Sequence, residues 1–107
     1  MTLTALQVLS TEDESVQICC TYDKLPVNIY IERAAIDAYL RITNSDAQYK
    51  RDFIKQNLDA LKLISETRFK KGLYEKENSN GTDVISIALT LADLMPLSLI
   101  KPRRRLG

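Results

Sequence analysis

Two adjacent cysteines, Cys19 and Cys20, are the side chains of this 107-residue sequence best suited to redox or metal chemistry. The chain has no histidine, which excludes Ser-His-Asp triads, Cys-His pairs and histidine-ligated zinc or haem. Neighbouring residues on a strand point to opposite faces, so a disulfide between these cysteines would be strained, and two cysteines alone cannot build a zinc site. A redox or metal-binding thiol pair is the alternative, but we expect two free thiols, no metal and no cofactor.

The sequence also gives little support for acid–base catalysis or phosphate binding. The carboxylates Asp37, Asp83 and Asp93 are scattered and belong to no recognisable motif. A phosphate-binding loop needs closely spaced glycines, whereas the three glycines of this chain lie far apart. The sequence therefore predicts a protein that is not an enzyme and has no catalytic residues.

The strongest charge feature is a basic tail at 101–107. Without its four cations the net charge of the chain would fall from +1 to −3. We expect this tail to be disordered, as a solvated terminus that aids solubility, and contact with nucleic-acid phosphates is the alternative. The candidate nucleic-acid contacts are Lys101, Arg103, Arg104 and Arg105.

Three residues are candidate contacts for a protein partner: Tyr30, Asn57 and Arg68. Tyr30 lies on the outer side of a predicted strand, and tyrosine is favoured at interfaces. Asn57 and Arg68 are polar residues on the apolar side of a predicted helix. The alternatives are packing of Tyr30 beneath a neighbouring element, a hydrogen bond from Asn57 to strand backbone, and an Arg68 stem whose charged head reaches solvent.

Alternating apolar residues predict the strands that would position these side chains. Residues 15–22 and 27–31 alternate across a short connection at 23–26, which indicates an antiparallel hairpin. A first strand is predicted over 3–9, and a last strand over 82–91 with Ile85, Ile87, Leu89 and Leu91 on its core face. A turn is predicted at 78–81, and residues 73–77 fit either an edge strand or a helical extension.

Helical spacing predicts a short helix over 32–42 and one long helix over 46–71. Ser45 and Gln48 fit a capping box at the start of the long helix, and Gly72 fits a left-handed residue after its end. Opposite its apolar stripe, charges of alternating sign predict a solvated face: Asp52, Lys55, Asp59, Lys62, Glu66 and Lys70.

The length, with 45% hydrophobic and 27% charged residues, indicates one domain over 1–100. We expect an α+β fold, with an antiparallel sheet of three to five strands and two helices packed on one face.

The order of elements over 15–91 resembles a small family of proteobacterial cytoplasmic proteins known only as a domain of unknown function. The resemblance is carried by residues 29–36, by Phe53, Asn57 and Leu61, and by 80–81 with 84–85. The chain departs from the family pattern at Glu32, where a Ser-like cap is usual, and at Asn57, where the family tends to carry a basic residue. The resemblance implies a bacterial protein and this fold, but no activity.

By elimination, the sequence favours a small cytoplasmic interaction or regulatory module that binds another protein or a second copy of itself. The apolar run at 85–100 is too interrupted to span a bilayer, and 1–10 lacks a signal-peptide pattern, so we expect no membrane contact. The alternatives are a nucleic-acid-associated protein acting through its basic tail, or a mobile-element inhibitor.

Overall fold

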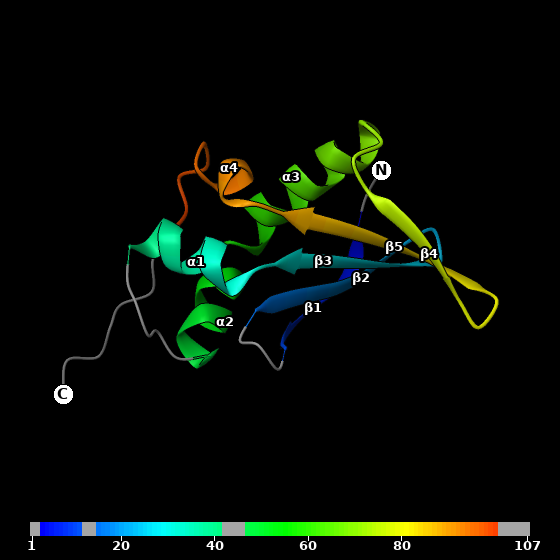
Figure 1. The fold of residues 1–107 in the computed structure, drawn as a ribbon, viewed down its shortest axis with the longest axis horizontal. Helices are drawn as coiled ribbons and strands as arrows, with labels where there is room; N and C mark the ends of the chain where they lie inside the picture. Colours follow the sequence, from blue (N-terminus) through cyan, green and yellow to red (C-terminus); the bar gives the residue numbers. More distant parts are fainter. Residues whose placement is uncertain (1–2, 12–14, 42–46, 101–107) are drawn as a thin grey trace.

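The computed structural model describes residues 3–11, 15–41 and 47–100. Along the chain, the elements are β1 (Thr4–Ser10), β2 (Val16–Tyr22), β3 (Leu25–Ile31), α1 (Arg33–Leu40), α2 (Ala47–Gln56), α3 (Leu58–Lys70), β4 (Glu75–Ser79), β5 (Thr82–Leu89) and α4 (Leu91–Leu94) (Figure 1). The fold is α+β, as the sequence predicts.

The five strands form one sheet in the order β1-β2-β3-β5-β4. The pairs β1–β2, β2–β3 and β4–β5 are antiparallel, whereas β3 and β5 are parallel, with Val27 beside Ile85 and Ile31 beside Leu89. The prediction of an antiparallel sheet with two helices is therefore wrong: the sheet is mixed, and the described residues contain four helices. Alternation of apolar residues identifies strands, but it carries no information about their relative direction.

Two tight turns fix the hairpins. Asp23 and Lys24 connect β2 to β3, and Asn80 and Gly81 connect β4 to β5, all with positive φ angles between 47° and 82°. Two-residue turns of this kind match the twist of the strands that they join. The predicted hairpin is confirmed, although its turn is shorter than 23–26 because Leu25 and Pro26 already belong to β3. Residues 73–77, left open between strand and helix, enter β4 at Glu75.

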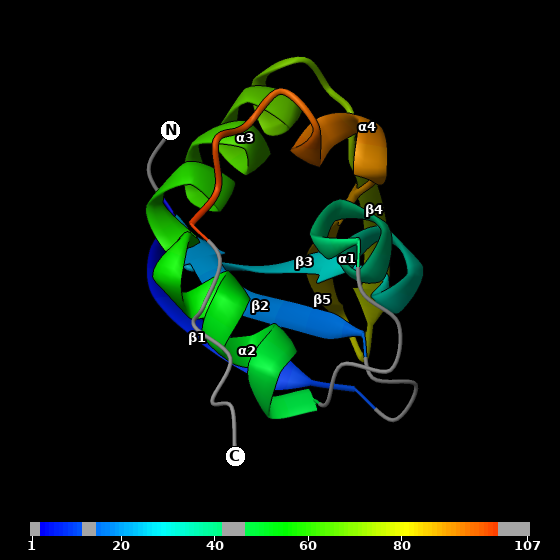
Figure 2. The ribbon, with the colours of Figure 1, turned by 90° about the vertical axis from the view of Figure 1, so that its left-hand side faces the viewer.

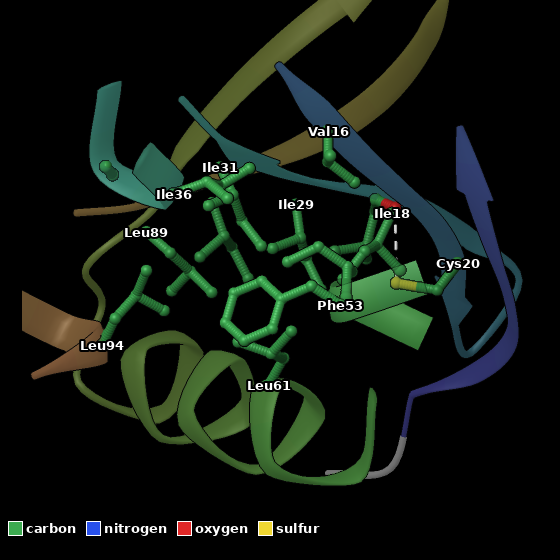
Figure 3. Packing of buried hydrophobic residues seen from close by; sticks show 14 of the residues in the cluster. Val16, Ile18, Cys20, Ile29, Ile31, Ile36, Phe53, Leu61, Leu89 and Leu94 are labelled. Atoms are coloured by element: carbon green, nitrogen blue, oxygen red, sulfur yellow. Dashed lines mark hydrogen bonds between the residues drawn. The ribbon is translucent and has the colours of Figure 1, made fainter. Parts of the chain in front are cut away.

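The core lies on one face of the sheet. On β2, β3 and β5 every second residue is buried, and the helices contribute Ile36, Phe53, Leu61 and Leu94 to the same cluster (Figure 3). The predicted inward residues Ile85, Ile87 and Leu89 are all buried. Phe53 lies at the centre of this cluster with its side chain fully excluded from solvent.

The predicted long helix is broken at Asn57 into α2 and α3. Asn57 leaves helical geometry at φ −114° and ψ 20°, although neither proline nor glycine lies nearby. The predicted end of the helix is confirmed. Gly72 adopts φ 74°, and the amides of Gly72 and Leu73 donate to the carbonyls of Phe69 and Arg68, as in a Schellman motif. The predicted cap Ser45 lies outside the described residues, and Gln48 instead bonds to Asp52 and Arg51.

Two charged side chains are buried against expectation. Glu66, predicted on the solvated face, is only 9% exposed and accepts a hydrogen bond of 3.0 Å from the amide of Leu3. Lys50 is 1% exposed, with its ammonium 3.7 Å from a carboxylate oxygen of Asp37. These contacts connect α3 to the start of β1 and α2 to α1, so both charges serve to join elements.

Phe53→Ala should lower the free energy of unfolding by about 3–5 kcal/mol, because it removes a fully buried ring and leaves a cavity. Urea unfolding followed by circular dichroism measures the change. Leu63→Ala is the control, since Leu63 on α3 is 65% exposed and should cost little. Equal losses in the two variants would contradict this view of the core.

Candidate binding site

A hollow of about 600 Å³ lies where α3 ends and β4 begins, beside β3 and β5. Two of the three predicted contact residues, Tyr30 and Arg68, line it, together with Tyr74, Glu75, Glu77 and several smaller residues. Tyr30 is beside Ala88 in the parallel pairing, and both alternate with core residues, so they lie on the sheet face that points away from the core. The fold thus places Tyr30 and Arg68 at one site, although they come from different elements.

Arg68 is fixed at this site by an ion pair. Its Nη1 donates to both carboxylate oxygens of Asp93, at 2.9 and 3.2 Å. Asp93 also accepts hydrogen bonds from the amide and hydroxyl of Thr90, which completes a capping box for α4. The Nε atom of Arg68 is buried and has no hydrogen-bond partner among the described residues. The ion pair with Asp93 therefore holds Arg68 in place at the hollow.

Aromatic rings provide a second kind of surface. Tyr74 stacks on Phe69 with ring centroids 4.7 Å apart, and Phe69 contacts Tyr22 at 5.3 Å. These contacts hold Tyr74 in place, while its exposed surface and that of Leu73 face the hollow. Rigid tyrosine rings contribute contact area at little cost in conformational entropy.

The hollow also carries negative charge. Glu75 and Glu77 are exposed on the same face of β4, and within the described ranges neither forms an ion pair. The residue between them, Lys76, pairs with Asp83 at 3.3 Å on the opposite face. Hydrogen bonds from Asn78 and Lys76, with the charge of Lys76, lower the pKa of Asp83. The two glutamates therefore remain available for a basic group of a ligand.

The third predicted contact residue, Asn57, lies elsewhere and is used within the fold. Its amide nitrogen donates to the carbonyls of Phe53 (2.8 Å) and Ile100 (2.7 Å), and its oxygen accepts from the amide of Ile100 at 2.6 Å. Tyr39 makes a similar pair of bonds, donating to the carbonyl of Leu97 and accepting from the amide of Leu99. Together they hold the segment after α4, which crosses in front of α3 in Figure 2, to α1 and to the junction of α2 with α3. The hydrogen bonds of Asn57 go to this segment and to Phe53 of α2, instead of to a strand.

The two cysteines are free thiols, as expected. Cys20 is buried, and its Sγ donates to the carbonyl of Val27. Burial, assisted by Cys19 and Glu66, raises the pKa of Cys20 to about 11. The neutral thiol therefore dominates at physiological pH, which makes Cys20 a poor nucleophile.

Other site types are not found in the part of the chain that the structure describes. Within residues 3–11, 15–41 and 47–100, no three Cys, Asp or Glu side chains are grouped to hold a metal ion. No helix of these ranges is long and apolar enough to cross a membrane. The candidate nucleic-acid contacts Lys101, Arg103, Arg104 and Arg105 lie outside the described residues, so their role stays a prediction.

Comparisons with known proteins give no family for this chain. No family model matches it, and neither a curated protein nor a solved structure matches it significantly. The resemblance to a proteobacterial family of unknown function therefore stays a prediction.

Asn57→Ala should cost about 1–3 kcal/mol of stability, because it removes a buried bond to the carbonyl of Phe53 and two part-buried bonds to the backbone of Ile100. The effect should be local: amide exchange of Leu99 and Ile100 should accelerate more than that of β3. Hydrogen exchange followed by NMR measures both. The control is Ser65→Ala, which removes a buried hydrogen bond to the carbonyl of Leu61 and leaves the C-terminal segment untouched. Unchanged exchange at Ile100 in Asn57→Ala would argue against the assigned bonds.

The raised pKa of Cys20 predicts a loss of stability at alkaline pH. The unfolded thiol ionises near pH 8.5, whereas the folded thiol ionises at about 11. The stability that comes from burying the neutral thiol of Cys20 is thus fully present below the pKa of the unfolded thiol. It is lost as the pH rises through the pKa of the folded thiol. Unfolding free energies from pH 7 to 11 should fall more steeply for the wild type than for Cys20→Ala. Parallel curves would contradict the assignment.

Proposed function

We propose that this protein is a small, non-catalytic interaction module that binds a segment of a partner protein in the hollow beside Tyr30 and Arg68. The observation that carries the proposal is the meeting of these two residues, from β3 and the end of α3, in one hollow. Its volume of about 600 Å³ falls within the usual range of roughly 300–1,000 Å³ for ligand sites.

The chemistry of the lining favours a segment with an arginine side chain. Glu75 and Glu77 offer two carboxylates without an ion pair among the described residues, which suits a guanidinium group. Tyr30 and Tyr74 offer rings on which a guanidinium can stack, an interaction worth about 0.5–1 kcal/mol at exposed sites.

The sheet beside the hollow favours an extended conformation of that segment. The ladder between β4 and β5 ends at the pair Glu75–Ser86, so residues 87–89 of β5 have no partner in β4. Ala88 in this stretch also lines the hollow. An extended peptide can pair with a strand that lacks a neighbour on one side through its main chain, while side chains at alternate positions give specificity.

Binding can be tested with two pools of end-blocked, fluorescently labelled peptides, one with a central arginine and one with a central glutamate, otherwise randomised. Fluorescence anisotropy should show tighter binding of the arginine pool. Tyr30→Ala should weaken it about tenfold, as expected for an interface tyrosine. Leu63→Ala, an exposed change on α3 outside the hollow, should have no effect.

Charge reversal tests the role of the glutamates separately. Glu77→Lys should shift the preference toward the glutamate pool, whereas Asp59→Lys, the same change of charge on α3, should not. Equal binding of both pools by the wild type, or equal effects of the two lysine variants, would refute the proposed site.

A further inference from the structure

The two edges of the sheet differ in how they are protected against strand addition. The edge strand β4 carries Glu75, Lys76 and Glu77 among its five residues. The opposite edge strand, β1, has seven residues and contains no charged side chain, no proline and no glycine. Charged residues and prolines are the usual means by which proteins keep an edge strand from pairing with another chain. Only β4 carries such charges, and the regular part of β1, from Gln7 to Ser10, has no charge, proline or bulge.

The turn geometry identifies which backbone groups of β1 point outward. Because a two-residue turn joins β2 to β3, Tyr22 and Leu25 form a hydrogen-bonded pair, and such pairs recur at every second residue. On β2, Gln17 and Cys19 therefore direct their amides and carbonyls toward β1, where they pair with Leu9 and Gln7. The amides and carbonyls of the alternate residues, Val8 and Ser10, consequently point away from the sheet.

An exposed leucine lies between these outward groups. Leu9 is 42% exposed and, because it is paired with Gln17, stands on the sheet face that points away from the core. If a second β1 approaches antiparallel, Val8 of one copy and Ser10 of the other can form hydrogen-bonded pairs. That register places Leu9 opposite Leu9 of the second copy, in the closer, non-hydrogen-bonded kind of pair.

We infer that β1 pairs with β1 of a second copy, antiparallel and centred on Leu9, to make one continuous sheet across a twofold axis. The pairing would form about four main-chain hydrogen bonds and cover both leucines without bringing like charges together. A bulge between Thr4 and Gln7 ends the regular part of β1, so the contact is short and the dimer depends on protein concentration. It uses the edge opposite β4 and is independent of the hollow.

The oligomeric state of the full chain tests this inference. Sedimentation velocity over a range of concentrations should show a monomer–dimer equilibrium. Leu9→Lys should raise the dimer dissociation constant at least about tenfold, since it places two ammonium groups against each other on the twofold axis. Leu63→Lys is the matched control because it changes another exposed leucine, on α3, and should leave the equilibrium unchanged. Circular dichroism checks that both variants are folded.

Cross-linking tests the register. In a Cys19→Ser background, Leu9→Cys should form an intermolecular disulfide on oxidation with diamide, because non-hydrogen-bonded pairs bring the two β-carbons close enough. Gln7→Cys, on the same face of β1, should cross-link much less. The inference fails if the wild type stays monomeric at every concentration, if Leu9→Lys leaves the equilibrium unchanged, or if position 7 cross-links as well as position 9.

Discussion

The parallel pairing of β3 with β5 is the constraint on which the rest of this fold depends. Parallel neighbours cannot be joined by a tight turn, so the chain must leave β3, cross the sheet and return. The segment from Arg33 to Ser79 makes this crossing and contains α1, α2, α3 and β4. The helices deliver Ile36, Phe53 and Leu61 to the core face, and the return through β4 creates the hollow at the end of α3. The segment that connects β3 to β5 thus contributes to both the core and the candidate site.

Local patterns predicted the elements better than their assembly. Alternation located β2, β3 and β5 because one face of each is buried, and the glycine signals at Gly72 and Gly81 fixed two ends. No proline or glycine marks the break at Asn57, which coincides with hydrogen bonds to Ile100, far along the chain. The burial of Glu66 likewise depends on Leu3, which helical periodicity does not include. In both cases, the structure differs from the local prediction at residues that contact distant parts of the chain.

The sequence predicts the candidate site only in part, because the site also depends on contacts between distant residues. In the sequence, Tyr30 stands out as an outward tyrosine and Arg68 as a polar residue on an apolar helix side, and the fold brings the two together. Their neighbours Glu75 and Glu77 cannot be predicted, because residues 73–77 fit both strand and helix by sequence, and only the strand gives the two glutamates a common face. Asn57 was selected on the same ground as Arg68, but its amide is occupied by the backbone around it.

The hydrogen bonds that hold the segment after α4 also have a consequence for the time course of folding. Tyr39 bonds to residues 58 and 60 positions later in the chain, and Asn57 bonds to a residue 43 positions later. Such contacts close long loops, and the entropy of closing them is lost before the bonds repay it. Both side chains must already be positioned by their helices before the segment can bind between them. The segment after α4 is therefore among the last parts of the described chain to reach its native place.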